Sequence, residues 1–192
     1  MRDTMSTQPH YFFAVRLPEW IKKTMHDQMM EITSVFHFKR WVHRADYHIT
    51  LAFLGAVEEK RLLAALQLVG EALQEKRSFP LRIERLDIFG NERSPRIFFA
   101  GVNDESQLYA LQKTVYEQCT AAGFTLETRP YHPHITLARK WSATSEFTIA
   151  LLEQCNPFGE TPLSFQVEEV VLYKTNIEKT PKYEPIVSLL LK

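Results

Sequence analysis

One five-residue segment occurs twice in this chain of 192 residues. His48-Ile49-Thr50-Leu51-Ala52 returns 86 positions later as His134-Ile135-Thr136-Leu137-Ala138. A second match, of Phe12-Phe13-Ala14 with Phe98-Phe99-Ala100, has the same offset. Two matches at one offset predict two copies of one structural unit, at about 10–55 and about 96–141, within a single domain of 1–192. The chain must therefore adopt a fold in which two similar units pack together.

Both copies of the repeated segment have the composition of a β-strand. Successive side chains of a strand point to opposite faces, so His48 and Thr50 share one face while Ile49 points to the other. His134 and Thr136 are related in the same way. Core packing accounts for a repeated isoleucine, but it does not account for a polar histidine and threonine repeated on the opposite face. We therefore expect each copy to present one imidazole and one hydroxyl from a rigid strand.

Hydrophobic periodicity divides the chain into strands and helices. We expect strands at 10–17, 47–54, 79–89, 96–102, 130–139, 163–175 and 184–191. Apolar residues recur at helical spacing after Pro18, within 58–75, between 103 and 123, and within 144–154. We interpret 35–44 as an irregular connection and 90–95 as a turn. The order β-α-β-α-β-β-α-β-α-β-β is typical of an α+β or α/β fold in which a strand–helix–strand unit occurs twice.

The charge and composition limit the classes of function. Hydrophobic residues make up 45% of the chain, and 23 basic residues balance 23 acidic residues to a net charge of zero. A protein that grips a long stretch of nucleic acid carries a large basic excess, so a nucleic-acid partner would be held at one end or one nucleotide. Cys119 and Cys155 have no metal-type spacing. With no signal peptide and no run of transmembrane length, we expect a cytoplasmic monomer without a membrane or obligate protein partner.

Two His-x-Thr segments that face one cleft would suit the hydrolysis of a cyclic phosphodiester. One imidazole can take a proton from water as the water attacks phosphorus, and the other can protonate the departing ribose oxygen. Threonine hydroxyls and a nearby arginine can bind the phosphoryl oxygens. The scheme needs no metal and no cofactor. The residues alone do not decide which histidine is the acid, because the repeat makes the two nearly equivalent.

Other interpretations of the histidines are possible. A structural role suits His10, His26 and His37, which have no histidine at the corresponding position of the second copy. A metal site could use His132 and His134 together with His43 or His48. Against a metal, the chain has no HExxH segment, no cysteine ligand and no carboxylate between residues 132 and 139. The evidence for a serine or cysteine nucleophile paired with a histidine is weaker still, because the sequence contains no nucleophile-elbow motif.

The residues around the two motifs resemble those of the 2H phosphoesterase superfamily, and most closely its RNA 2′,3′-cyclic phosphodiesterase branch, also called 2′-5′ RNA ligase-like proteins. A single HxT motif is weak evidence for this superfamily, but two motifs with these flanking residues are specific to it. The matching segments are Phe13-Ala14-Val15-x-Leu17-Pro18, Trp41-Val42, His48-Ile49-Thr50-Leu51-x-Phe53-Leu54-Gly55, Arg96-Ile97-x-x-Ala100-Gly101-Val102, Arg129-Pro130-x-x-Pro133-His134-Ile135-Thr136-Leu137-Ala138-Arg139 and Leu172-Tyr173-Lys174.

The resemblance implies a fold and a reaction. The fold would be α+β and bilobal, with two pseudo-twofold-related β-α-β lobes whose antiparallel sheets line a central cleft, one HxT motif in each lobe. The reaction would open an RNA 2′,3′-cyclic phosphate to a 2′-phosphomonoester without metal. His48 would be the proton donor to the leaving 3′ oxygen and His134 the proton acceptor that activates water. Thr50 and Thr136 would bind the phosphate.

Further substrate contacts are expected around the motifs. Arg139 follows the second motif where Phe53 follows the first, so Arg139 is a candidate for binding phosphate or nucleotide. Trp41, Phe53 and Tyr131 are candidates for stacking on a base. The chain departs from the family pattern at Asp46-Tyr47, where Asn-Leu is common, and this departure affects the substrate fit near the first motif.

Several alternatives remain open at this point. The substrate could be an RNA 3′ end or a small cyclic nucleotide. Within the enzyme class, the rivals are a 2′-5′ RNA ligase or 2′-5′ phosphodiesterase and a phosphodiesterase acting on ADP-ribose 1″,2″-cyclic phosphate. In a different class, the protein would be a nucleotide- or RNA-end-binding module without turnover, although binding alone does not need two acid–base groups.

Overall fold

A computed structural model describes residues 8–192, so the expectation about targeting signals at the first residues lies outside the described part. The helices are α1 (Glu19–Ile32), α2 (Glu59–Leu73), α3 (Ser106–Ala121) and α4 (Ala150–Gln154), with a single 3-10 turn, η1 (Arg44–Asp46). The strands are β1 (His10–Arg16), β2 (Phe38–Trp41), β3 (His48–Ala56), β4 (Phe79–Asn91), β5 (Ser94–Val102), β6 (His134–Trp141), β7 (Leu163–Val167), β8 (Glu169–Thr175) and β9 (Tyr183–Leu190).

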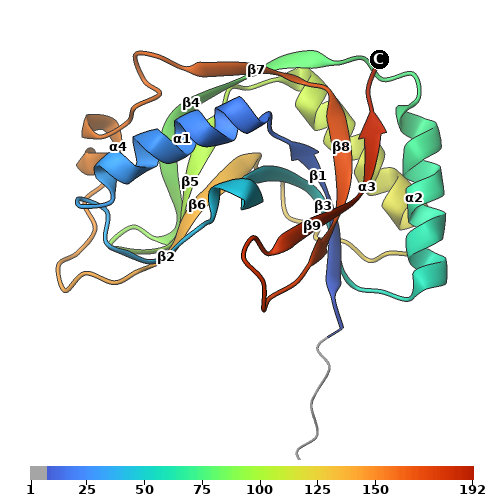
Figure 1. Ribbon diagram of the computed structural model, residues 1–192, viewed down its shortest axis with the longest axis horizontal. Helices are drawn as coiled ribbons and strands as arrows, with labels where there is room; N and C mark the ends of the chain where they lie inside the picture. The colour runs from blue at the N-terminus through green and yellow to red at the C-terminus, as the bar shows by residue number, and fades with distance from the viewer. Residues whose placement is uncertain (1–7) are drawn as a thin grey trace, which may run out of the picture.

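The strands form two antiparallel sheets, which confirms the α+β fold class (Figure 1). The four-stranded sheet has the order β3-β1-β8-β9, and the five-stranded sheet has the order β2-β6-β5-β4-β7. The chain passes between the sheets several times, because β2 joins the second sheet and β8 and β9 return to the first. The two halves are therefore interleaved, and the first and last strands of the chain lie in the same sheet.

Helices cover the outer face of each sheet. In Figure 1, α1 crosses over β4 and β5, while α2 and α3 lie beside the four-stranded sheet. Each helix turns one apolar stripe inward, as with Ile21, Met25 and Met29 of α1, all at most 1% exposed. The predicted alternation along the repeated strands is also confirmed, because Ile49 of β3 and Ile135 of β6 are fully buried. The opposite faces of β3 and β6 are thus left free to form a site.

The strand pairing refines the sequence repeat. Ala14 of β1 pairs with Thr50, and Phe99 of β5 pairs with Thr136. In both sheets a register shift follows at this point, so that Leu51 in one copy and Leu137 in the other is the extra residue. Ala14 and Phe99 are 85 residues apart, whereas the two threonines are 86 apart. Relative to the paired threonines, the segment Phe12-Phe13-Ala14 is therefore displaced by one residue from the segment Phe98-Phe99-Ala100 that it matches in sequence.

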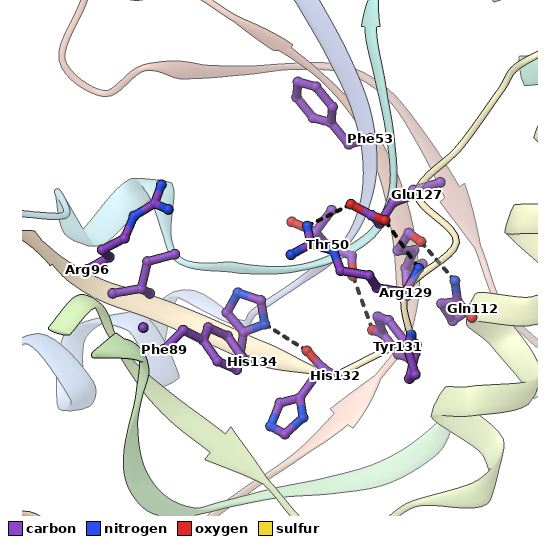
Figure 2. A pocket seen from close by; sticks show the side chains of 15 residues that line it. Thr50, Phe53, Phe89, Arg96, Gln112, Glu127, Arg129, Tyr131, His132 and His134 are labelled. Carbon is purple, nitrogen blue, oxygen red and sulfur yellow. Dashed lines mark hydrogen bonds and ion pairs between the residues drawn. The ribbon is translucent and has the colours of Figure 1, made fainter. Parts of the chain in front are cut away.

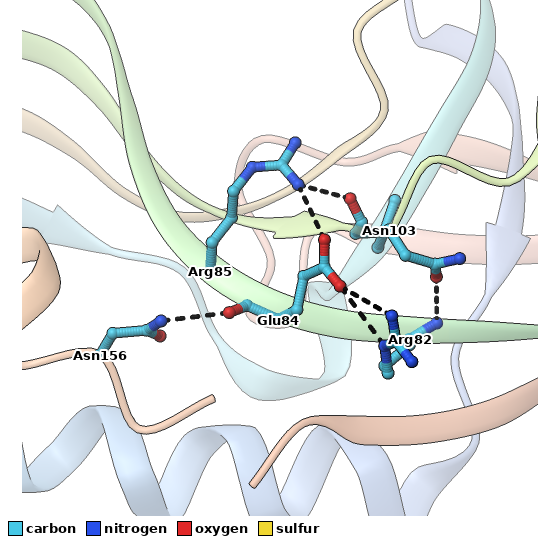
Figure 3. A network of polar contacts seen from close by, with 6 residues as sticks. Arg82, Glu84, Arg85, Asn103 and Asn156 are labelled. Atoms are coloured by element: carbon cyan, nitrogen blue, oxygen red, sulfur yellow. Dashed lines mark hydrogen bonds and ion pairs between the residues drawn. The ribbon is translucent and has the colours of Figure 1, made fainter. Parts of the chain in front are cut away.

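Polar contacts along β4 fix the segments that flank the five-stranded sheet (Figure 3). The backbone N–H of Arg82 donates to Oδ1 of Asn103 over 2.7 Å, and Nδ2 of Asn156 donates to the backbone oxygen of Glu84 over 3.1 Å. The side chains of Arg82 and Glu84 form an ion pair at 3.2 Å, which is exposed and contributes little by itself. The two amide contacts therefore anchor the connection before α3 and the loop after α4 to one strand.

Three predicted segments differ from the structure because long-range pairing decides them. The 35–44 connection contains β2, which pairs with β6 at the edge of the five-stranded sheet. The single strand expected at 163–175 is two strands, since β7 pairs with β4 and β8 pairs with β1. The helix expected at 144–154 is only α4, because the ring of Phe147 is buried in the core before the helix begins. None of the helices within residues 8–192 is long and apolar enough to cross a membrane.

Candidate active site

The two HxT motifs meet at one cavity of about 260 Å³, although they belong to different sheets. β3 and β6 each begin at the histidine of the motif, and the two strands contact one another. We call this space the central cavity. It is lined by His10, Phe12, Val42, Asp46, His48, Thr50, Phe53, Ile97, His134, Thr136, Arg139, Thr175 and Tyr183. Both imidazoles and both hydroxyls therefore face the same small volume.

His48 is held by a hydrogen bond on each side of its ring. Its Nδ1 lies 2.7 Å from the backbone oxygen of Asp46, and its Nε2 lies 3.1 Å from Oγ1 of Thr50. A carbonyl oxygen can only accept, so Nδ1 carries the hydrogen and the neutral ring keeps its lone pair on Nε2. The rings of Phe12 and Tyr183 enclose the imidazole, with centroids at 4.9 and 5.1 Å. Nε2 is thus the atom available for proton transfer.

His134 repeats this arrangement from the other sheet. Its Nδ1 donates to the backbone oxygen of His132 over 2.7 Å, again two residues back along the chain (Figure 2). Phe89 lies edge-on to the ring at 4.9 Å, and Phe99 lies at 5.3 Å. The same tautomer follows, with the lone pair of the neutral ring on Nε2. The two histidines of the sequence repeat are therefore oriented by equivalent hydrogen bonds to the backbone.

Burial keeps both imidazoles neutral in the free protein at pH 7. Desolvation lowers the pKa of His48 from 6.5 to about 4, although the backbone bond to Asp46 and the Asp46 charge favour the protonated ring. Desolvation also lowers the pKa of His134, against the opposing effect of the His132 carbonyl. A phosphate anion between the rings would favour their protonated forms, because opposite charges attract strongly in a cavity that excludes water.

These directions predict an acidic optimum for kcat/KM. This parameter rises with pH as the base loses its proton in the free enzyme and falls as the acid loses its proton. The pKa of His48 lies at about 4, and the pKa of His134 is lowered below 6.5. We therefore expect a bell-shaped curve of kcat/KM against pH whose maximum lies below pH 6.5. Initial rates measured from roughly pH 4 to 9, with folding followed by circular dichroism, test this expectation. A maximum on the alkaline side of neutrality contradicts it.

Asp46 is a residue of the cavity that the sequence analysis did not assign to the site. It is only 5% exposed, and its carboxylate accepts the backbone N–H groups of Lys182 and Tyr183, each at 3.0 Å. Its own carbonyl accepts from His48. One residue therefore joins the first motif to the turn before β9, which carries the Tyr183 ring. Its position two residues before His48, at a departure from the family pattern, was the available signal.

The residues that follow the two motifs make the cavity asymmetric. Arg139 of β6 is exposed and lines the central cavity, and it forms no ion pair with any carboxylate of residues 8–192. Phe53 of β3 occupies the equivalent place, is 54% exposed and meets His10 edge-on at 5.6 Å. An anion in the cavity would thus have a free cation on the β6 side and an apolar ring on the β3 side.

The two other candidates for base stacking have different surroundings. Trp41 lies against Phe38 and Phe98 of the core, with ring centroids at 6.2 and 6.0 Å. The hydroxyl of Tyr131 donates to the backbone oxygen of Thr50 over 3.1 Å (Figure 2). Burial raises the pKa of this phenol, so it stays protonated and remains a donor. Tyr131 therefore braces the first motif, and stacking of a base on either ring stays a prediction.

Residues 8–192 contain no group of three or more histidine, cysteine, aspartate or glutamate side chains placed to hold a metal ion. The alternative site considered from the sequence needs His132 beside His134. The His132 ring lies edge-on to Phe89 and Phe99, at 5.1 and 5.8 Å, the same two rings that pack against His134, and His43 does not line the central cavity. The residues that line the central cavity include two imidazoles, two threonine hydroxyls and one guanidinium, which are groups that transfer protons or bind anions.

Known proteins share both the sequence and the fold of this chain. A family model described as the 2′-5′ RNA ligase superfamily matches residues 22–177. A protein of Geobacillus stearothermophilus named RNA 2′,3′-cyclic phosphodiesterase is 42% identical over 92% of this chain, and the chain spans 55% of that protein. A Bacillus subtilis protein of the same name is 35% identical over 93% of this chain and 94% of its own length.

Solved structures give the same result for the fold. Escherichia coli LigT in complex with 3′-AMP has a TM-score of 0.76 and 26% identity, covering 96% of this chain and 99% of that one. The protein TT0787 of Thermus thermophilus has a TM-score of 0.74 and 23% identity, covering 95% and 97%. The arrangement of two antiparallel sheets is therefore shared along nearly the whole chain.

Proposed function

This chain belongs to the 2′-5′ RNA ligase superfamily, and from that membership we propose that it hydrolyses RNA 2′,3′-cyclic phosphate ends to 2′-phosphomonoesters. The observation that carries the proposal is the convergence of His48 and His134 on one cavity, each with Nδ1 bound to a carbonyl. Two imidazoles with Nε2 available are what an in-line displacement at phosphorus needs on its two sides. The names of the Geobacillus and Bacillus relatives support the same reaction.

The proposed step transfers two protons while one bond forms and one breaks. Nε2 of His134 takes a proton from water, and the water oxygen forms a bond to phosphorus. The bond from phosphorus to the 3′ oxygen breaks, and Nε2 of His48 gives its proton to that oxygen. The phosphate remains on the 2′ oxygen, and the two imidazoles exchange protons with solvent before the next turnover. Thr50, Thr136 and Arg139 bind the phosphoryl oxygens as their charge redistributes.

The family resemblance assigns the acid role to His48, and the Asp46 carboxylate acts in that direction against the larger effect of burial, which lowers the pKa of His48 to about 4. Asp46 places a buried carboxylate near His48, whereas the residue two positions before His134 is another histidine. A negative neighbour favours the protonated imidazole, and a second basic ring disfavours it. Burial makes the protonated His48 a strong proton donor because it lowers the pKa of that ring. The bound phosphate would supply the charge that keeps the proton in place until transfer.

The experiment that tests the function uses a short oligonucleotide with a 2′,3′-cyclic phosphate end, incubated with the protein in EDTA. We expect hydrolysis, with the product's phosphate on the 2′ oxygen as identified by NMR against a 2′-phosphate standard. Activity that appears only with an added divalent metal would contradict the metal-free scheme. Tight binding without turnover would favour the RNA-end-binding module, and hydrolysis of only 2′-5′ linkages or ADP-ribose 1″,2″-cyclic phosphate would favour the other substrates.

A further inference from the structure

A second, larger cavity of about 760 Å³ adjoins the central cavity (Figure 2). We call it the side cavity. It shares Thr50, Phe53, Ile97 and His134 with the central cavity, so the two spaces adjoin at residues of both motifs. Its remaining walls are Leu51, Ala52, Phe89, Gly90, Arg96, Gln112, Glu127, Arg129, Pro130, Tyr131 and His132. The proposed hydrolysis of the phosphate uses none of these remaining residues.

The walls of the side cavity are tied together across the two sheets. Tyr131 donates to the Thr50 oxygen at 3.1 Å, and Nε2 of Gln112 in α3 donates to the Leu51 oxygen at 3.3 Å. On the other side, Phe89 stacks on Phe99 with ring centroids at 4.3 Å. These contacts fix the positions of the walls relative to one another. A pre-formed space of this kind binds a ligand at a lower cost in conformational entropy.

Arg96 is placed at the side cavity by a glycine. Gly90 has φ +104°, and a Cβ built there would lie 3.2 Å from the Arg96 nitrogen and 3.3 Å from its Cγ. The glycine therefore leaves room for the arginine stem, which crosses it at the end of the β4–β5 hairpin. Within residues 8–192 Arg96 forms no ion pair, whereas Arg129 at the same cavity binds Glu127 at 2.6 Å. Arg96 is thus a cation that can pair with an external anion.

An exposed aromatic ring lines the same cavity as this cation. Figure 2 shows Arg96 at the left of the cavity and Phe53 at the top, with His134 below both. Phe53 is 54% exposed. A free cation and an exposed ring on different walls are the groups that bind the phosphate and the base of single-stranded nucleic acid. The central cavity alone, at about 260 Å³, has room for little beyond the reacting nucleotide.

We propose that the side cavity binds the RNA strand that carries the cyclic phosphate, with a phosphodiester at Arg96 and a base on Phe53. This inference rests on the proposed function and narrows its substrate class to oligonucleotide ends. The side cavity would contact about one nucleotide beyond the reacting one, so binding needs no large basic surface. That requirement agrees with the zero net charge of the chain.

The test compares kcat/KM for a trinucleotide and for a mononucleoside, both ending in a 2′,3′-cyclic phosphate. We expect the trinucleotide to be preferred by about tenfold or more, and Arg96→Ala to lower the ratio of the two values about tenfold. Arg96→Lys keeps the charge but loses the planar fork, so its ratio should lie between those of the wild type and Arg96→Ala. Arg93→Ala is the matched control, because Arg93 lies in the same hairpin but pairs with Glu146.

The outcomes separate this inference from the proposed function. The side-cavity site is overturned if both substrates are hydrolysed with nearly equal kcat/KM values. It is also overturned if Arg96→Ala leaves the ratio of the two kcat/KM values unchanged. In both cases the proposed reaction stands. If neither substrate is hydrolysed, the function fails, and fluorescence anisotropy then tests the site by binding alone. There we expect a labelled trinucleotide 2′-phosphate to bind the wild type more tightly than Arg96→Ala. Equal binding overturns the inference.

Discussion

Replacing His48 with alanine is expected to lower kcat/KM for a 2′,3′-cyclic phosphate end by about 10²–10⁴-fold, and replacing His134 should have an effect of similar size. Each variant removes one of the two proton-transfer groups at the central cavity. Initial rates with the oligonucleotide substrate in EDTA measure the loss. Because the two rings act in one step, the double variant should be little worse than either single variant.

Controls separate lost catalysis from lost folding in this experiment. His37→Ala removes an exposed imidazole outside both cavities and should keep the wild-type rate. Thermal unfolding of each variant should remain cooperative. A His48→Ala or His134→Ala protein that folds and keeps most of its activity would rule out two-histidine catalysis at this cavity.

Asp46→Ala is expected to have the largest effect on stability among single changes near the site. The variant leaves the backbone N–H groups of Lys182 and Tyr183 without their acceptor. An unsatisfied buried donor costs about 1–3 kcal/mol, so the free energy of unfolding should fall by about 3 kcal/mol in total. For a chain of this length, that change corresponds to a Tm lowered by roughly 6–12 °C. Urea and thermal denaturation measure the two quantities.

Activity should fall as well, because the same carboxylate holds the turn that carries the Tyr183 ring against His48. We expect kcat/KM to drop about tenfold at a temperature where the variant is folded, since small displacements of catalytic groups are costly. Asp46→Asn keeps one oxygen acceptor and should lose less stability. Asp27→Ala is the matched control, because its carboxylate pairs with Lys23 on the exposed surface. Equal losses of stability and activity in Asp46→Ala and Asp27→Ala would show that Asp46 has no special role at the site.

The core of the candidate site could be predicted because its signal is local. The period of two along a strand places His48 beside Thr50 and buries Ile49, whatever the partner strand is. The same holds for the second motif, whereas the meeting of the two motifs at one cavity was expected only from the family resemblance. Strand and helix positions with strong periodicity, such as those of β3 and α2, were predicted for the same reason.

Long-range pairing decided what the sequence analysis missed. The apolar pattern of 163–175 does not record that the backbone changes partner after β7. The match of Phe12 with Phe98 concealed one added residue, which only the strand register reveals. Asp46 and Tyr183 are 137 residues apart, and nothing local in either segment indicates their hydrogen bond.

The sequence by itself determined that two imidazoles and two hydroxyls stand on rigid strands, because side-chain alternation is a property of the extended backbone. Only the tertiary structure decided which distant segments surround them: the rings of Phe12 and Tyr183 at His48, the ring of Phe89 at His134, and the side cavity beyond. Burial, charge and hydrogen bonding depend on which distant segments meet. Those contacts make the surroundings of the two copies of one motif chemically different.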